Sequence, residues 1–209
     1  MRDYLNDPAE IYRQSFATIR AMADLSSLPV SARSIAERVI HSCGMTDIVA
    51  DLRISADLPQ AVAQALRDRK PIFTDSEMVR HGIIARVLPP GAEIICTLND
   101  DKARELGLAR KITRSAAAVS LWLPRLKGAV VVIGNAPTAL FALLEALDAG
   151  ADRPAAIVGF PVGFIGAKES KDELAENPRG TPFATLLGRR GGSAMAASVV
   201  NAITADMNI

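Results

Sequence analysis

Only two side chains of this chain, His41 and His81, have an ordinary pKa near neutral pH, and they limit where acid–base chemistry can occur. His41 stands near the end of a helix expected at residues 31–43. There Ser34, Arg38 and His41 recur at i, i+4 and i+7, so their side chains are neighbours. A solvated polar face is the simple interpretation of this stripe, and a proton donor beside a ligand is the functional one. For His81, on a short helix, a local helix-end contact is the more ordinary role, so we rank His41 first.

Three segments, residues 128–138, 155–164 and 183–193, each combine an apolar strand, a glycine-bearing turn and a helix start. We expect unpaired N–H groups at these helix starts, which favour anions and would meet at the carboxyl edge of a parallel sheet. The turns lack the GxGxxG and GxxxxGK[ST] spacings, so plain connections are the alternative. The candidate ligand contacts in and after these turns are Asn135, Thr138, Gly163, Lys168 or Lys171, Arg189 and Arg190, with Phe160 and Phe164 as a possible apolar wall.

The arginines of the third turn, Arg189 and Arg190, are suited to binding carboxylates through paired hydrogen bonds, although a solvated basic turn is the alternative. Together the three turns therefore predict a ligand with several anionic arms.

The composition excludes several classes of function. The chain has 209 residues and a formal net charge of +1, so no broad field favours nucleic acid or an anionic membrane. No apolar run approaches the roughly 20 residues of a membrane helix, and the first residues lack a signal-peptide core, which predicts a cytoplasmic protein. The two cysteines, Cys43 and Cys96, have no metal-ligand spacing, so we expect no metal. Apolar residues make up 49% of the chain, which suggests some burial between subunits.

Helical and strand patterns alternate along most of the chain. Expected helices cover residues 8–23, 31–43, 59–69, 75–81 and 112–123, and expected strands cover 71–74 and 93–98, followed by the three strand–turn–helix segments. Such alternation predicts an α/β fold, a three-layer α/β/α arrangement with a mostly parallel central sheet. No linker or change of composition divides the chain, so we expect a single domain over residues 1–209.

Taken together, these motifs resemble those of the precorrin-8X methylmutases of the cobalamin pathway. The match is carried by Ser15, residues 37–41, residues 75–79 with Gly82, residues 113–115, residues 134–138, residues 159–171 and residues 188–193. No single piece is specific, but the ordered set is, and it covers nearly the whole chain. The resemblance implies an isomerase that acts as a homodimer without a cofactor.

The same resemblance implies a reaction and roles for individual residues. Precorrin-8X would become hydrogenobyrinate by migration of a methyl group from C-11 to C-12 of the corrin precursor. A histidine is the family's proton donor or acceptor, and by motif that role falls on His41. Ser15 and Arg38 match substrate-binding positions, and Arg114 matches a position near the reacting ring. The broad apolar ring of such a substrate, with its acetate and propionate arms, fits the anion contacts expected above.

Several alternatives remain open at this point. A tetrapyrrole carrier that has lost catalysis would keep the same pocket, and a nucleotide-binding regulatory domain is disfavoured by the absent phosphate-loop spacing. The motifs do not distinguish a metal-free substrate from a cobalt-containing one. In one departure from the family, Ala85 stands in a stretch where many relatives are expected to carry a hydroxyl residue.

Overall fold

A computed structural model describes residues 4–207, and these form a six-stranded sheet in the order β1-β6-β5-β4-β2-β3. The strands are β1 (Leu52–Ile54), β2 (Ile72–Thr74), β3 (Ile94–Cys96), β4 (Val130–Ile133), β5 (Ala156–Gly159) and β6 (Phe183–Leu186). All neighbouring strands run parallel except β1, which pairs antiparallel with β6. The expected mostly parallel sheet is confirmed.

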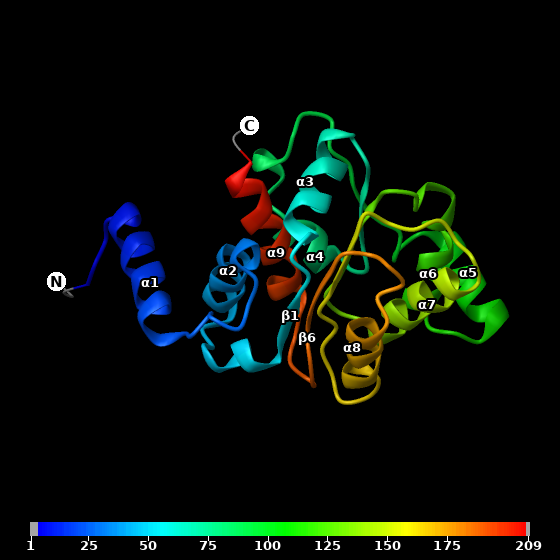
Figure 1. Cartoon of the computed structure of the whole chain (residues 1–209). Coiled ribbons are helices and arrows are strands. Elements are labelled where there is room, and N and C mark those ends of the chain that lie inside the picture. The colour runs from blue at the N-terminus through cyan, green and yellow to red at the C-terminus, as the bar shows by residue number, and fades with distance from the viewer. Residues whose placement is uncertain (1–3, 208–209) are drawn as a thin grey trace.

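Helices cover both faces of the sheet (Figure 1). The α-helices are α1 (Pro8–Met22), α2 (Arg33–Cys43), α3 (Leu58–Arg67), α4 (Glu77–Gly82), α5 (Asp101–Arg110), α6 (Arg114–Ser120), α7 (Pro137–Asp148), α8 (Ala167–Glu176) and α9 (Ser193–Asp206). The short 3-10 helices are η1 (Val30–Ala32), η2 (Asp47–Asp51), η3 (Ala85–Val87) and η4 (Leu123–Arg125). Buried side chains of α2, α3, α4 and α9 pack on one face, and those of α6, α7 and α8 pack on the other. The predicted three-layer α/β/α fold is confirmed.

Strand β4 shows how the two faces are built. Val130 and Val132 pack into one apolar cluster, whereas Val131 and Ile133 pack into the other. All four side chains are fully buried, which explains why this strand reads as a continuous apolar run rather than as an alternation. The sheet is therefore sandwiched between two apolar cores, and its carboxyl edge carries the three glycine-bearing turns.

Most expected elements are present, but helix α5 and strand β1 were missed, and helices α2, α4 and α6 each begin two residues later than expected. Helix α5 escaped the pattern because it is largely polar and buries only Ala103 and Gly107. Strand β1 has only three residues, with exposed Arg53 between two buried neighbours. The helix expected from residue 112 begins at Arg114, because the Thr113 hydroxyl caps it by accepting a hydrogen bond from an amide three residues later, at 3.1 Å.

Helix α1 stands out from the body of the molecule, with α2 between it and the sheet (Figure 1). Its start is as predicted: Asp7 is the N-cap and accepts a hydrogen bond from the amide of Glu10 at 2.7 Å, and Pro8 occupies the first turn. Only Phe16 and Ile19 of this helix are buried. Among residues 4–207, no helix combines the length and apolar character needed to span a membrane.

Candidate active site

His41 lies in the last turn of α2, where Gly44 ends the helix in a left-handed conformation with φ of 71°. The imidazole is exposed at its edge but stacks on the ring of Phe16 from α1, with ring centroids 5.0 Å apart and an angle of 24° between the planes. Helix α1 therefore covers one face of the histidine. The polar stripe of α2 stays largely exposed at Ser34 and His41, and the stacking on Phe16 is the packing contact of the imidazole.

A groove of about 620 Å³ opens between α1 and α2 beside His41, and we call it the His41 groove. Most of its wall is apolar, with a few polar groups, as is usual for small-molecule sites. Its lining residues are Leu5, Ile11, Gln14, Ser15, Thr18, Ile19, Met22, Ile40, His41, Gly44 and Thr46. The structure thus brings together two residues chosen from the sequence, Ser15 and His41.

Arg38 lies one turn before His41 on α2 and contacts the same Phe16 ring. Its guanidinium donates a hydrogen bond to the Tyr12 hydroxyl at 2.7 Å, and its central carbon lies 5.4 Å and 5.2 Å from the ring centroids of Tyr12 and Phe16. Arg38 lines a second hollow of about 350 Å³ together with Ser34 and Glu37. It therefore borders the region of His41 without lining the same groove.

The first glycine-bearing turn, at the start of α7, does not present free amides. Asp75 is 1% exposed, and its carboxylate accepts hydrogen bonds from the backbone amides of Gly134, Asn135 and Ala136 at 2.9, 2.9 and 2.7 Å. Burial raises the pKa of Asp75, although the three N–H donors act in the opposite direction. The expectation of unpaired donors is wrong for these three amides, because a carboxylate of the chain already occupies the position of an external anion.

The other two turns are bonded to each other. The amide of Gly192 donates to the Phe160 carbonyl at 2.8 Å, and the amide of Gly163 donates to the Arg189 carbonyl at 3.2 Å. A side chain at Gly191 would place its Cβ only 2.5 Å from the Phe160 carbonyl oxygen. Glycine at this position therefore permits a close approach between two backbone segments of the chain.

Two aromatic residues of the second turn differ in exposure. Phe160 is fully buried, so it is not available as a wall for a ligand, and this expectation is wrong. Phe164 is 86% exposed, and the guanidinium carbon of Arg189 lies 5.7 Å from its ring centroid. Of the pair, only Phe164 remains able to cover an apolar ligand.

The basic candidates are placed around the molecule rather than in one cluster. Lys168 pairs with Asp172 one turn further along α8, which raises the pKa of Lys168. Arg114 borders a separate hollow of about 360 Å³ near the end of α5. Thr138 shares a hydrogen bond of 2.7 Å between its hydroxyl and that of Thr113.

Arg190 is also engaged within the chain. Its guanidinium is bonded to Asp47 at 2.6 Å and to Asp51 at 3.2 Å, and these hydrogen bonds raise its pKa. Apart from Ser15 and His41, none of the predicted site residues lines the His41 groove.

The sequence assigned only Ser15 of α1 to the substrate, whereas a whole face of this helix lines the groove. Ile11, Ser15, Thr18 and Met22 recur at helical spacing and line one side of it, and that spacing was readable in the sequence. The stacking partner Phe16 was not recognised, because its role depends on how α1 packs on α2. Within residues 4–207, no group of three or more His, Cys, Asp or Glu side chains is placed to hold a metal ion.

Comparison with known proteins places this geometry in a family. The family model described as precorrin-8X methylmutase matches residues 10–205. The chain belongs to the precorrin-8X methylmutase family. It is 52% identical over 206 residues to the precorrin-8X methylmutase of Pseudomonas aeruginosa, with 99% of each chain covered. It is 37% identical to the cobalt-precorrin-8 methylmutase of Salmonella typhimurium, with 96% of each chain covered.

A solved structure shows the same relationship in three dimensions. The crystal structure of a precorrin-8X methylmutase from Thermus thermophilus superimposes with a TM-score of 0.84 at 30% identity, and 94% of this chain and 95% of that one are covered. The predicted family and enzyme class, an isomerase of cobalamin biosynthesis, are confirmed. The resemblance found in the motifs thus extends to the whole fold.

Proposed function

We propose that this chain converts precorrin-8X to hydrogenobyrinate by moving a methyl group from C-11 to C-12, with His41 as the proton donor. The observation that carries the proposal is the position of His41 at the edge of a largely apolar groove, with its ring held against Phe16 and the Ser15 hydroxyl in the same groove. The largely apolar wall of the groove suits a conjugated ring better than a strongly polar ligand. Family membership supplies the class of substrate.

His41 would donate a proton or hydrogen bond to a ring nitrogen or to the adjoining conjugated system. This makes the system more electron-poor and lowers the barrier to a suprafacial methyl shift. General acid assistance of this kind is worth about 10²–10⁴ in rate. The remaining acceleration comes from holding the ring in its reactive geometry away from water, for which the apolar groove wall is suited.

The carboxylate arms of the substrate require cationic and polar partners around the groove. Arg38 is a basic candidate close to His41, because its guanidinium and the imidazole contact the same Phe16 ring. Five more distant candidates stay part of the proposal as contacts for the longer arms; these are Arg114, Asn135, Thr138, Lys168 and Arg189. The amide of Gly163 and the guanidinium of Arg190 are left out because both are bonded within the chain. Among them the Arg189 side chain is exposed, and the contact of its guanidinium with the face of the Phe164 ring does not use its N–H donors, which can therefore bind carboxylates.

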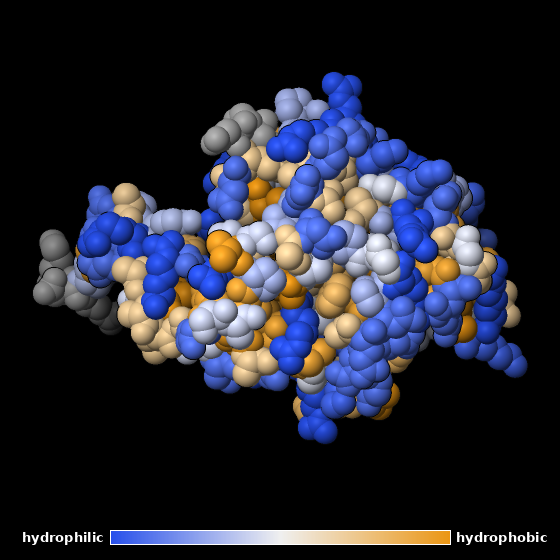
Figure 2. All heavy atoms as spheres, viewed as in Figure 1, coloured by the Kyte–Doolittle hydropathy of each residue, from blue (hydrophilic) through white to orange (hydrophobic). Residues whose placement is uncertain are grey.

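We further propose that the chain acts as a homodimer in the cytoplasm. Apolar side chains of α1 are exposed where this helix borders the groove: Ile11 is 43% exposed and Met22 is 66% exposed. Apolar atoms are visible on the surface near the junction of α1 with the body (Figure 2). A second subunit covering this helix would bury them and would shield the His41 groove from water.

The relatives favour a metal-free substrate. Identity is 52% to the relative named precorrin-8X methylmutase from Pseudomonas aeruginosa and 37% to the one named cobalt-precorrin-8 methylmutase from Salmonella typhimurium. We therefore propose precorrin-8X, without cobalt, as the natural substrate.

The experiment is to mix the purified chain with precorrin-8X and to follow the absorption spectrum. The proposal predicts conversion to the corrin spectrum of hydrogenobyrinate without any added cofactor. A binding spectrum that never changes to that of the product would instead indicate a carrier and would contradict the proposed isomerase. Retention of the coloured product during gel filtration would show in addition that the chain holds hydrogenobyrinate tightly.

A further inference from the structure

Lys171 of α8 is a buried basic residue to which the proposed mechanism gives no role. Its side chain is fully buried, and its ammonium Nζ donates a hydrogen bond to the backbone carbonyl of Arg190 at 2.5 Å. No carboxylate in the described part of the chain lies within ion-pair distance of it. A buried charge without a counter-ion is costly, so its presence calls for a specific role. Through this hydrogen bond Lys171 fixes the turn between β6 and α9.

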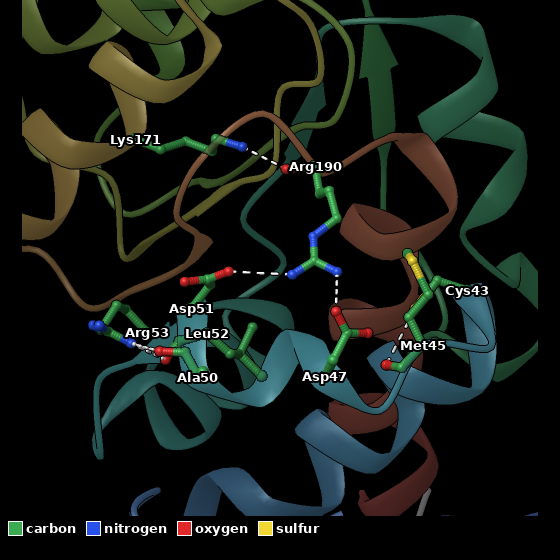
Figure 3. A network of polar contacts seen from close by, with 9 residues as sticks. All are labelled: Cys43, Met45, Asp47, Ala50, Asp51, Leu52, Arg53, Lys171 and Arg190. Carbon is green, nitrogen blue, oxygen red and sulfur yellow. Dashed lines mark hydrogen bonds and ion pairs between the residues drawn. The ribbon is translucent and has the colours of Figure 1, made fainter.

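The same turn is held from its other side by the Arg190 side chain. The guanidinium bridges Asp47 and Asp51, which are the first and last residues of η2. Figure 3 shows the resulting chain of contacts, from Lys171 through the Arg190 backbone and side chain to the two carboxylates. Helix α8 and η2 are therefore connected through a single residue.

Helix η2 directly continues the segment that forms one end of the His41 groove. Gly44 ends α2 three residues before Asp47, and Thr46, the residue immediately before Asp47, lines the groove together with His41 and Gly44. Cys43 and Met45 lie beside the Arg190 guanidinium in the same view (Figure 3). A displacement of η2 would therefore be transmitted to this end of the groove within a few residues.

We infer that Lys171 and Arg190 are positioning residues: they fix η2, and with it the end of the groove that carries His41 and Thr46. This inference rests on the proposed function, because it assigns the contacts of Lys171 and Arg190 a purpose in the isomerase reaction. It differs from the idea that Arg190 binds a carboxylate of the substrate. In a positioning role its guanidinium stays bonded to Asp47 and Asp51 while the substrate reacts.

The chain offers a matched control in Arg179. This residue also bridges two carboxylates, Asp148 at 2.6 Å and Glu173 at 2.5 Å. It precedes β6, whereas Arg190 follows β6, so the two arginines lie at opposite ends of one strand. Loss of either arginine removes two similar ion pairs. Of the two residues, Arg190 is the one that binds η2, the segment next to the groove.

The test compares kcat, KM and thermal unfolding for Arg190→Met, Lys171→Met and Arg179→Met, each assayed well below its unfolding temperature. Positioning predicts that the first two variants lose kcat by roughly 10-fold to 10²-fold, with affinity for hydrogenobyrinate changed little. Arg179→Met should keep the parental kcat although it is also destabilised. Arg190→Lys, which can still pair with one aspartate, should recover part of the lost turnover.

A further variant, Asp47→Asn, separates positioning from substrate binding. Positioning predicts that it loses kcat in the same way as Arg190→Met and that the two losses are not additive. If Arg190 binds substrate, Asp47→Asn should instead keep or raise affinity, because the guanidinium is released. The inference is overturned by that result, by a parental kcat in Arg190→Met, or by an equal loss in Arg179→Met. Failure of the unmodified chain to isomerise precorrin-8X would refute the proposed function itself, which is a separate result.

Discussion

His41 and the three glycine-bearing turns were both expected to bind ligand, but they differ in whether their polar groups already have partners within the chain. At the turns, the amides of Gly134, Gly163 and Gly192 are bonded to acceptors of the chain itself. In the groove, His41 and Ser15 border an open volume of about 620 Å³. Polar groups that are bonded to other parts of the chain therefore stabilise the fold. Polar groups that border an open groove can instead bind a ligand.

The two regions also differ in the elements that build them. The turns lie at the carboxyl edge of the sheet, where ligands of open α/β folds usually bind. The groove lies between α1 and α2, and α2 separates α1 from the sheet (Figure 1). The proposed acid of this chain is thus carried by packed helices rather than by a strand end.

The largest effect is expected from His41→Ala, which removes the proposed proton donor. Product formation from precorrin-8X should fall by about 10²–10⁴, while hydrogenobyrinate still binds, because the apolar groove wall is intact. The matched control is His81→Ala, since the His81 side chain is exposed on α4 and lies 3.7 Å from Glu77, away from the His41 groove. Single-turnover absorption measurements distinguish the two variants. Equal turnover in both would remove the distinction drawn for His41.

The next largest effect is expected from Asp75→Ala and concerns stability. The change leaves one buried and two partly buried amides of the first turn without their acceptor, at about 1–3 kcal/mol for a buried unsatisfied group and less for a partly buried one. We expect the free energy of unfolding to fall by about 3 kcal/mol or more, measured by urea denaturation. Asp75→Asn, which keeps one acceptor oxygen, should lose less. A parental free energy of unfolding in Asp75→Ala would mean that these amides find other partners.

Lys171 predicts a pH dependence of stability. Burial lowers its pKa from 10.5 to about 8, although Asp172 and Asp51 act in the opposite direction. Between these two pH values the unfolded chain binds the proton more strongly than the folded one, so the free energy of unfolding rises with pH across the window. Lys171→Met should lack this rise when the two proteins are compared by urea denaturation at pH 7.5, 9 and 10.5. Parallel curves would show that the lysine titrates normally.

A smaller effect is expected from Ser15→Ala. Loss of one hydrogen bond to a ligand should weaken hydrogenobyrinate binding about 2-fold to 10-fold, as measured by absorption titration. The control is Ser42→Ala, because the Ser42 hydroxyl donates to the Val39 carbonyl and does not line the groove. If both variants bind equally well, the Ser15 hydroxyl does not contact the ligand.

The smallest effect is expected from Ala85→Thr, which restores the hydroxyl expected in many relatives. Ala85 is exposed at the start of η3 and does not line the groove. Steady-state turnover should change by a few-fold at most, through substrate contact or product release. Identical turnover in the parent and the variant would show that the departure is neutral.

The fold was largely predictable because its signals are local. Strand β4 is a continuous apolar run, and Asp7 with Pro8 marks the start of α1. Helix α5 and strand β1 were missed because neither has a clear apolar periodicity: α5 is mostly polar, and β1 takes its shape from pairing with β6. Local pattern thus predicts elements that bury one face, and it fails for those defined by their neighbours.

The site was predictable only in part, because its polar groups compete for partners. The motifs identified Ser15 and His41, and the structure places both in one groove. They did not show that Asp75 would occupy the amides of the first turn or that Asp47 would bind Arg190. Both acceptors lie far along the chain from their donors, and such long-range contacts cannot be predicted from the spacing of residues in the sequence.

The most direct measurement is the imidazole NMR spectrum of the histidine-labelled chain during titration with hydrogenobyrinate. The chain has two histidines, so two sets of ring signals are expected, and the His81→Ala variant assigns them. Ligand binding in the groove predicts that the His41 ring signals shift with saturation while those of His81, 78% exposed in its side chain, stay in place. Unchanged His41 signals at full saturation would place the ligand elsewhere and would contradict the account.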